Sequence, residues 1–208
     1  MKAPNHKPAL LAAAAALVSL LPIAAFGATK VEVDKPKFDS VPSPQFGGVK
    51  GEPWSPKDWL KIECKLKIEQ APEPKSKTCE TLTVKWYVAV ENPEKASTYL
   101  KLTKEVQHVN LPLGEDVYSC VFISPASIRR LTGSDRAGKG CVKFVGVEVL
   151  ADGAVVATEA IGKDKWWTMA SDKISDSSTV PLQSKSETPF AACWWDRYAE
   201  EKPATGTR

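Results

Sequence analysis

Five cysteines are the residues of this sequence whose chemistry is most direct, because thiols form disulfides and bind metals. They are Cys64, Cys79, Cys120, Cys141 and Cys193. There is no Cys-x-x-Cys pair among them, so their spacing does not indicate a zinc site. Because their number is odd, at most two disulfides form within one chain. The thiol left over is either buried and inert or paired with another molecule. The sequence therefore predicts disulfides without fixing which cysteines pair.

Two pairs of neighbouring tryptophans are the second candidate site. Trp166-Trp167 and Trp194-Trp195 could form a surface that stacks on sugars or binds a partner protein. They could also clamp the C-terminal segment onto the rest of the protein, because tryptophan buries a large apolar area. Neighbouring residues of a strand point to opposite faces, so one ring of each pair could pack while the other stays exposed. We favour the packing role and keep the binding role as the alternative.

Residues suited to catalysis are scarce. His108 is the single histidine beyond the N-terminal segment, and its place on a predicted strand favours a structural role. Residues 133–140 resemble a phosphate-binding loop, but Gly140 stands where the magnesium-binding hydroxyl belongs, and a strand follows instead of a helix. The sequence contains neither a Gly-x-Ser-x-Gly turn nor a calcium-loop pattern. We therefore expect a protein that is not an enzyme and that uses no metal or other cofactor.

The N-terminus has the pattern of an export signal. Lys2 and Lys7 precede an uncharged apolar run over residues 10–26, which ends in the small-residue site Ala25-Phe26-Gly27. A proline interrupts the run, and a membrane-spanning helix needs roughly 20 residues, so a cleaved signal peptide is favoured over a retained anchor. We therefore expect residues 1–27 to be removed. The mature protein would lie in the periplasm, on the outer surface or in the medium, without a membrane span.

The charge of the mature chain argues against one class of partner. Beyond residues 1–27, 26 basic residues stand against 25 acidic ones. Proteins that bind nucleic acids concentrate positive charge on one face. A nearly neutral chain with mixed signs is not expected to bind nucleic acid.

Hydrophobic periodicity divides the mature chain into three parts. Residues 28–60 are rich in proline and glycine, which disfavour regular strands, so we expect an extended arm or a disordered linker. Residues 61–160 alternate between apolar and polar side chains with a period of two, which is typical of strands with one buried face. Residues 161–208 lack that pattern, and we expect them to form a C-terminal extension that packs on the strands.

Six strands and one short helix are predicted in the middle part. Ser124-Pro125 is typical of a helix N-terminus, so a helix is expected from there to Leu131. Asp152-Gly153 predicts a two-residue hairpin turn that places Val149 opposite Val156. The predicted strands cover residues 61–69, 82–91, 98–109, 117–124, 142–151 and 154–160. Their hydrated outer faces favour antiparallel sheets, so the predicted fold class is mainly β, a sandwich or barrel.

Two tryptophan-containing segments and the signal peptide carry a resemblance to a known family. The segments are Asp164-Lys165-Trp166-Trp167 and the stretch from Thr188-Pro189-Phe190-Ala191 to Trp194-Trp195-Asp196-Arg197-Tyr198. In these the chain resembles the small immunoglobulin-like proteins encoded in verrucomicrobial type IV pilus-like gene clusters. The resemblance implies an immunoglobulin-like antiparallel β-sandwich in the cell envelope, with one short helix and irregular N- and C-terminal extensions. A true pilin keeps a long apolar helix after processing, so we expect a pilus-associated protein instead of a pilin subunit.

Immunoglobulin domains supply one further expectation. Tyr118 stands two positions before Cys120, as in the tyrosine corner of such domains, and Cys64 and Trp86 would be its partners. The likeness would imply a disulfide between Cys64 and Cys120. Trp86 lies 22 positions after Cys64, which is a longer gap than those domains use.

The function predicted from all these features is that of an exported, non-catalytic structural or interaction protein of the cell envelope. Its expected partners are envelope or pilus proteins, or further copies of itself through exposed strand edges. The alternative is a carbohydrate-binding module that uses exposed tryptophans.

Overall fold

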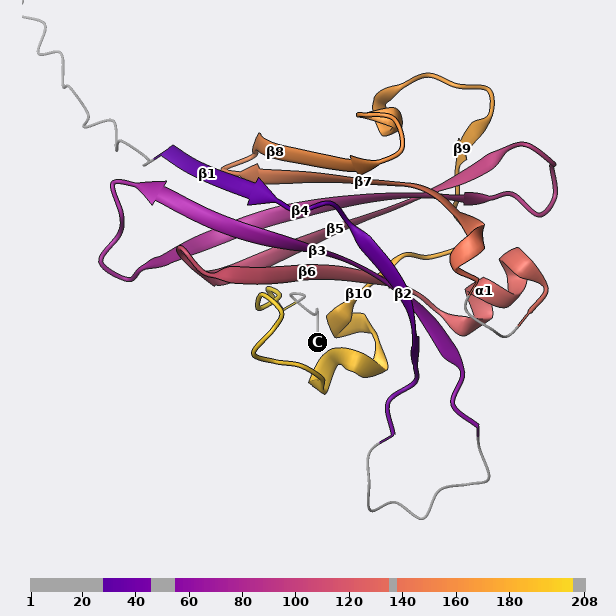
Figure 1. Ribbon diagram of the computed structural model, residues 1–208, viewed down its shortest axis with the longest axis horizontal. Coiled ribbons are helices and arrows are strands. Elements are labelled where there is room, and N and C mark those ends of the chain that lie inside the picture. The colour runs from indigo at the N-terminus through magenta and orange to yellow at the C-terminus, as the bar shows by residue number, and fades with distance from the viewer. Residues whose placement is uncertain (1–27, 46–54, 135–137, 204–208) are drawn as a thin grey trace, which may run out of the picture.

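Two β-sheets packed face to face form the body of the protein (Figure 1). The computed structural model describes residues 28–45, 55–134 and 138–203. Sheet A contains β1 (Ala28–Val33), β2 (Lys37–Pro42), β3 (Asp58–Ala71), β6 (Asp116–Ile123) and β10 (Gln183–Ser184). Sheet B contains β4 (Thr78–Glu91), β5 (Tyr99–Pro112), β7 (Val142–Ala151), β8 (Ala154–Ile161) and β9 (Ile174–Asp176). The mainly β sandwich expected from the sequence is confirmed.

The order of the strands is that of an immunoglobulin-like sandwich. Sheet A runs β1-β3-β6-β10, with β2 also paired to β3, and sheet B runs β8-β7-β4-β5-β9. The pairs are antiparallel except for β5 with β9, which is parallel. The sequence-adjacent strands β3 and β4 thus lie in different sheets, as strands B and C do in immunoglobulin domains.

Alternating side chains build the core between the sheets. On β3, Ile62 and Leu66 are fully buried while Lys61 and Lys65 lie on the outer face. On β4, Val84, Trp86 and Val88 are fully buried in the same apolar cluster. Trp86 occupies the strand that carries the core tryptophan of immunoglobulin domains.

The helix and the hairpin form where the sequence predicts them. The helix α1 (Pro125–Thr132) begins behind Ser124, whose hydroxyl accepts a hydrogen bond from the backbone of Ser127 at 3.2 Å. Asp152 and Gly153 both have positive φ angles, 50° and 78°, as a type I′ turn requires. The predicted register is wrong by one residue, however. Val149 pairs with Ala157 because a bulge lies between Val149 and Leu150.

The N-terminal part differs from the expected arm. Strands β1 and β2 pair with successive halves of β3, and β3 itself begins at Asp58. The prolines do not prevent this pairing because Pro36 lies in the break between the two strands and Pro42 ends the second. Residues 46–54 lie outside the described part of the chain, as does the predicted signal peptide over residues 1–27. In the described residues, no helix is long and apolar enough to span a membrane.

Short segments cover the outer sides of both sheets (Figure 1). Besides α1, the chain forms the 3-10 helices η1 (Lys139–Cys141), η2 (Trp166–Thr168), η3 (Lys185–Glu187) and η4 (Pro189–Ala192). The segment with η2 packs on sheet B through aromatic residues. The segment with η3 and η4, drawn in yellow, lies beneath β6 and β10. Residues of the C-terminal extension thus pack on both sheets, and they do so largely through short 3-10 turns.

A chain of hydrogen bonds crosses the core and connects both sheets to the C-terminal segment. The imidazole of His108 lies 2.9 Å from the hydroxyl of Ser119 through Nε2, and 3.3 Å from the carbonyl oxygen of Glu200 through Nδ1. The indole of Trp86 donates to the same hydroxyl at 3.3 Å. Because the carbonyl can only accept, Nδ1 carries a proton. Burial lowers the pKa of the imidazole and so favours its neutral form, in which Ser119 donates to Nε2.

The neutral state of His108 makes the stability of the fold depend on pH. Burial lowers the pKa of this fully enclosed imidazole below its ordinary value of 6.5. The unfolded chain therefore binds a proton more readily than the folded one when the pH falls below about 6.5. The contribution of His108 is complete above that pH and is lost as the pH falls towards the lower pKa of the folded state. We expect urea unfolding to show a smaller free energy at about pH 5.5 than at about pH 8.

A His108→Gln variant isolates this effect because its side chain does not titrate. We expect it to be less stable than the wild type at about pH 8, by roughly 1–3 kcal/mol, since buried polar groups lose partners. Between those two pH values its free energy of unfolding should change less than that of the wild type. An equal change in the free energy of unfolding of both proteins would show that His108 is not the source of the pH dependence. The carboxyl groups of Glu63 and Glu187 have pKa values below their ordinary 4.5. Their effect on the stability of the fold is therefore lost only at pH values below 4.5, outside the range compared here.

Candidate interaction surface

The first tryptophan pair is a clamp inside the protein. Trp166 and Trp167 are both buried, on the outer side of sheet B. Trp167 stacks on Tyr87 with ring centroids 5.2 Å apart, and its indole donates to Glu148 at 2.9 Å. Tyr87 donates to the second oxygen of the same carboxylate at 2.9 Å. The possibility that one ring of each pair stays exposed does not apply here, because the two residues lie in a 3-10 turn and not on a strand.

The second pair is exposed. Trp194 has 47% and Trp195 66% of its surface accessible, which makes them two of the four large exposed hydrophobic residues of the described chain. Trp194 stacks on Phe190 at 5.6 Å, and Phe190 stacks on Phe122 of β6 at 4.8 Å. A row of three parallel rings thus runs from the sheet to the surface. Of the sequence-predicted surface, only Trp194 and Trp195 are available for binding.

The backbone at Trp194 adds to this exposure. Its φ angle is 54°, in the left-handed region that large side chains rarely adopt. The conformation turns the chain back, so that Arg197 donates its backbone N–H to the carbonyl of Trp194 at 3.2 Å. Such conformations persist only where surrounding contacts enforce them, and they cluster at functional sites.

A group of charged residues frames the ring row. Glu63 of β3 accepts a hydrogen bond from the hydroxyl of Tyr198 at 2.5 Å and from Arg197 at 3.0 Å, and pairs with Lys61 at 3.0 Å. Burial alone would raise the pKa of Glu63, but Tyr198 and Lys61 outweigh it and lower the pKa. Lys61 also lies over the ring of Trp194, 5.7 Å from its centroid. The frame holds the aromatic rings against sheet A.

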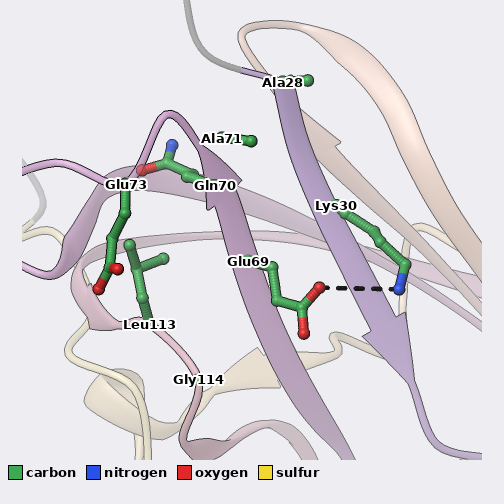
Figure 2. A pocket seen from close by; sticks show the side chains of 8 residues that line it. All are labelled: Ala28, Lys30, Glu69, Gln70, Ala71, Glu73, Leu113 and Gly114. Atoms are coloured by element: carbon green, nitrogen blue, oxygen red, sulfur yellow. Dashed lines mark ion pairs between the residues drawn. The ribbon is translucent and has the colours of Figure 1, made fainter.

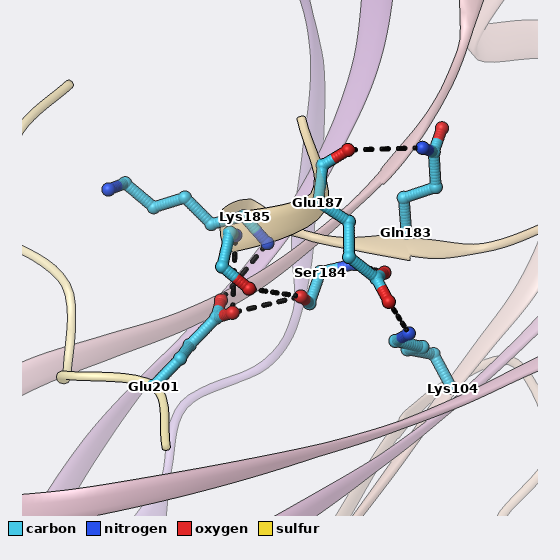
Figure 3. Close-up of polar contacts among 7 residues, drawn as sticks. Lys104, Gln183, Ser184, Lys185, Glu187 and Glu201 are labelled. Atoms are coloured by element: carbon cyan, nitrogen blue, oxygen red, sulfur yellow. Dashed lines mark hydrogen bonds and ion pairs between the residues drawn. The ribbon is translucent and has the colours of Figure 1, made fainter. Parts of the chain in front are cut away.

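Glu201 closes the turn that leads into this surface (Figure 3). Its carboxylate accepts from the hydroxyl of Ser184 at 2.8 Å and from the backbone of Lys185 and Ser186 at 3.0 and 3.1 Å. Glu187 caps the same turn from within and pairs with Lys104 of β5 at 2.6 Å. The side chain of Lys185 extends away from Glu201, towards the aromatic residues.

Sequence reasoning missed Lys185, whose ammonium lies 5.0 Å from the ring centroid of Trp195. A Ser-x-x-Glu capping pattern at residues 184–187 was the available signal that a turn begins there. A cavity of about 180 Å³ lies beside Trp195, with Lys185, Ser186, Glu200 and Glu201 among its lining residues.

A larger cavity of about 500 Å³ lies at the far end of β3 (Figure 2). Ala28, Ala71 and Leu113 supply apolar lining, while Lys30 and Glu69, which lie opposite each other on β1 and β3, form an ion pair at 3.7 Å. None of the residues that the sequence analysis singled out lines this cavity. We therefore take the Trp194–Trp195 surface as the candidate site.

The cysteines are free thiols, and the disulfides expected from their number do not form. Cys64 and Cys120 lie on the neighbouring strands β3 and β6 of one sheet, at positions that face opposite sides. The tyrosine-corner interpretation is wrong as well. Tyr118 does not join a disulfide-bonded core but packs against Tyr198 on the outer side of sheet A. Cys193 is half-buried, and the other four are buried.

Thiol labelling of the native protein tests whether the five cysteines are free thiols. Burial raises the pKa of Cys141 to about 11 and also raises those of Cys64, Cys79 and Cys120. Only the thiolate reacts, so iodoacetamide should modify Cys193 first. Mass spectrometry should show one label under native conditions and five in urea without reductant. A Cys193→Ser variant is the control; fewer than five labels in urea would reveal a disulfide.

The clamp on sheet B depends on a glycine. A Cβ atom at Gly146 of β7 would collide with the ring of Trp167. We expect Gly146→Ala to lower the free energy of unfolding by about 1–3 kcal/mol in urea titrations, since overpacking forces the ring to move. Gly140→Ala is the matched control, because a Cβ atom there meets nothing within 4 Å. Equal stability of the two variants would show that Trp167 is not held against β7.

Comparison with known proteins agrees with the fold. A family model matches residues 23–205 of the chain. A crystal structure from Akkermansia muciniphila is 40% identical in sequence, with a TM-score of 0.81. The match covers 86% of this chain and 96% of that one. No curated protein matches. The chain therefore belongs to the same family as this Akkermansia muciniphila protein.

Proposed function

We propose that the protein is an exported, non-catalytic structural and interaction module of the cell envelope. It would act beyond the cytoplasm, after removal of residues 1–27, by binding envelope proteins or components of a type IV pilus-like assembly. The observation that carries the proposal is the exposure of Trp194 and Trp195 on a rigid support. Tryptophan is enriched among the residues that dominate the binding energy of protein interfaces.

The support of these rings favours recognition of a partner. Exposed apolar residues on a mobile segment lose conformational freedom when they bind, which weakens the complex. Here Trp194 is fixed by the stack through Phe190 and by its turn with Arg197. Arg197, whose side chain is 45% exposed, pairs with Glu63 beside this surface and would supply part of the polar rim of an interface.

Binding to envelope extracts of the source organism tests the proposal. We expect the immobilised mature protein to retain a specific envelope or pilus-like protein, identified by mass spectrometry. The Trp194→Ala/Trp195→Ala double variant should bind that purified protein at least about tenfold more weakly. Sedimentation velocity of the same proteins would show whether the bound partner is another copy of the chain.

Met169→Ala provides the matched control. Met169 is also exposed, at 41%, but it follows η2, on the segment that packs on sheet B. This variant should bind like the wild type. If the double variant retained full affinity while Met169→Ala did not, the interface would lie elsewhere on the protein.

Carbohydrate binding is the second candidate function. The observation that favours it is the cavity of about 180 Å³ beside Trp195, which combines an aromatic ring with polar groups. Binding sites for small ligands have this composition of apolar walls and a few placed polar groups.

A further inference from the structure

The cavity beside Trp195 contains a buried cation with unused hydrogen-bonding capacity. Only 7% of Lys185 is exposed, and its ammonium donates to the carbonyl of Ala191 at 2.9 Å. It also lies over two rings, 5.0 Å from the centroid of Trp195 and 5.8 Å from that of Tyr198. An ammonium has three N–H donors, and within the described residues a single oxygen accepts from it. The remaining donors call for oxygen atoms from an occupant of the cavity, because unpaired buried charge is costly.

The charges around the cavity restrict the kind of occupant. Lys185 contributes one positive charge, whereas Glu200 and Glu201 contribute two negative ones. An anionic ligand would meet a net negative lining, and a cationic ligand would meet the ammonium directly. A neutral ligand with several hydroxyl groups suits both, because hydroxyls donate to carboxylates and accept from an ammonium.

One of the two carboxylates is available to such a hydroxyl. Both oxygens of Glu201 already accept hydrogen bonds from the turn at η3, so this group is rigid. Glu200 receives a bond from Asn110 at 3.1 Å on Oε2. Its Oε1 has no hydrogen bond from the described residues, which leaves it available to an incoming hydroxyl.

The size and the aromatic wall of the cavity complete the pattern. A volume of about 180 Å³ equals that of about six water molecules, which suits one sugar ring and not a chain of them. Trp195 is held from one side by Lys185 and is 66% exposed, so it can stack on the apolar face of a ring. We propose that this cavity binds one neutral pyranose residue at the end of a glycan; the proposal rests on carbohydrate binding as the second candidate function.

Titrations with single sugars test this assignment. The probes are the methyl glycosides of glucose, galactose, mannose and N-acetylglucosamine, with glucuronic acid as the anionic and glucosamine as the cationic probe. Binding is measured by saturation-transfer NMR and by tryptophan fluorescence. We expect at least one neutral sugar to bind more tightly than both charged ones. Trp195→Ala and Lys185→Met should each weaken that binding at least about tenfold.

Two controls separate the outcomes. Met169→Ala should bind like the wild type. Circular dichroism should show that Lys185→Met is folded. If that variant is not folded, the test rests on Trp195→Ala, which removes an exposed ring. If only glucuronic acid or only glucosamine bound, and did so through Trp195, carbohydrate binding would stand and the neutral-sugar assignment would fall. If no sugar bound, or if binding survived Trp195→Ala, both would fall. The capture of a protein partner is measured separately and does not depend on either result.

Discussion

The hydrogen-bonded chain from Trp86 through Ser119 and His108 to Glu200 is the constraint on which the structure depends most. A polar group placed between two apolar sheets is tolerated only when all its partners are present. Here the partners come from β4, β6, β5 and the C-terminal segment, so the bonds form only when both sheets and that segment are in register. The interaction adds little net energy compared with the apolar core, but it selects one arrangement of the layers.

Aromatic covers on both outer faces explain why the extension behaves as part of the domain. A two-layer sandwich normally leaves its outer faces hydrated. In this chain the outer faces carry Phe122 on sheet A and Tyr87 on sheet B, and each recruits rings from residues 161–203. Burial of such rings stabilises the covering segments by roughly 25 cal/mol for each Å² removed from water. Two additional apolar clusters therefore flank the central core, and the extension packs on the sheets instead of projecting from them.

Sequence periodicity was sufficient for the sandwich because strands such as β3 alternate buried apolar residues with more exposed polar ones at a fixed spacing. It failed where the outcome depends on contacts between distant segments. The proline-rich residues 28–42 form edge strands because β3 offers them a free edge, which no local pattern reveals. The pairing of Cys64 with Cys120 failed because β6 belongs to the same sheet as β3. The tryptophan pairs were found, but the sequence did not show which pair would be buried and which exposed. Both lie in 3-10 turns or left-handed turns that tertiary packing sets.

The same C-terminal residues close the core and shape the candidate site, so the site inherits the rigidity of the fold. Glu200 joins the hydrogen-bonded chain through its backbone, and its carboxylate borders the cavity. Tyr198 is anchored to Glu63 on sheet A and forms part of the aromatic surroundings of Lys185. A ligand or partner that meets groups already fixed in place loses less conformational entropy on binding than one that must order them. Exposed tryptophans and a buried ammonium are unfavourable for stability alone, and this favours the proposed role of this surface in recognition.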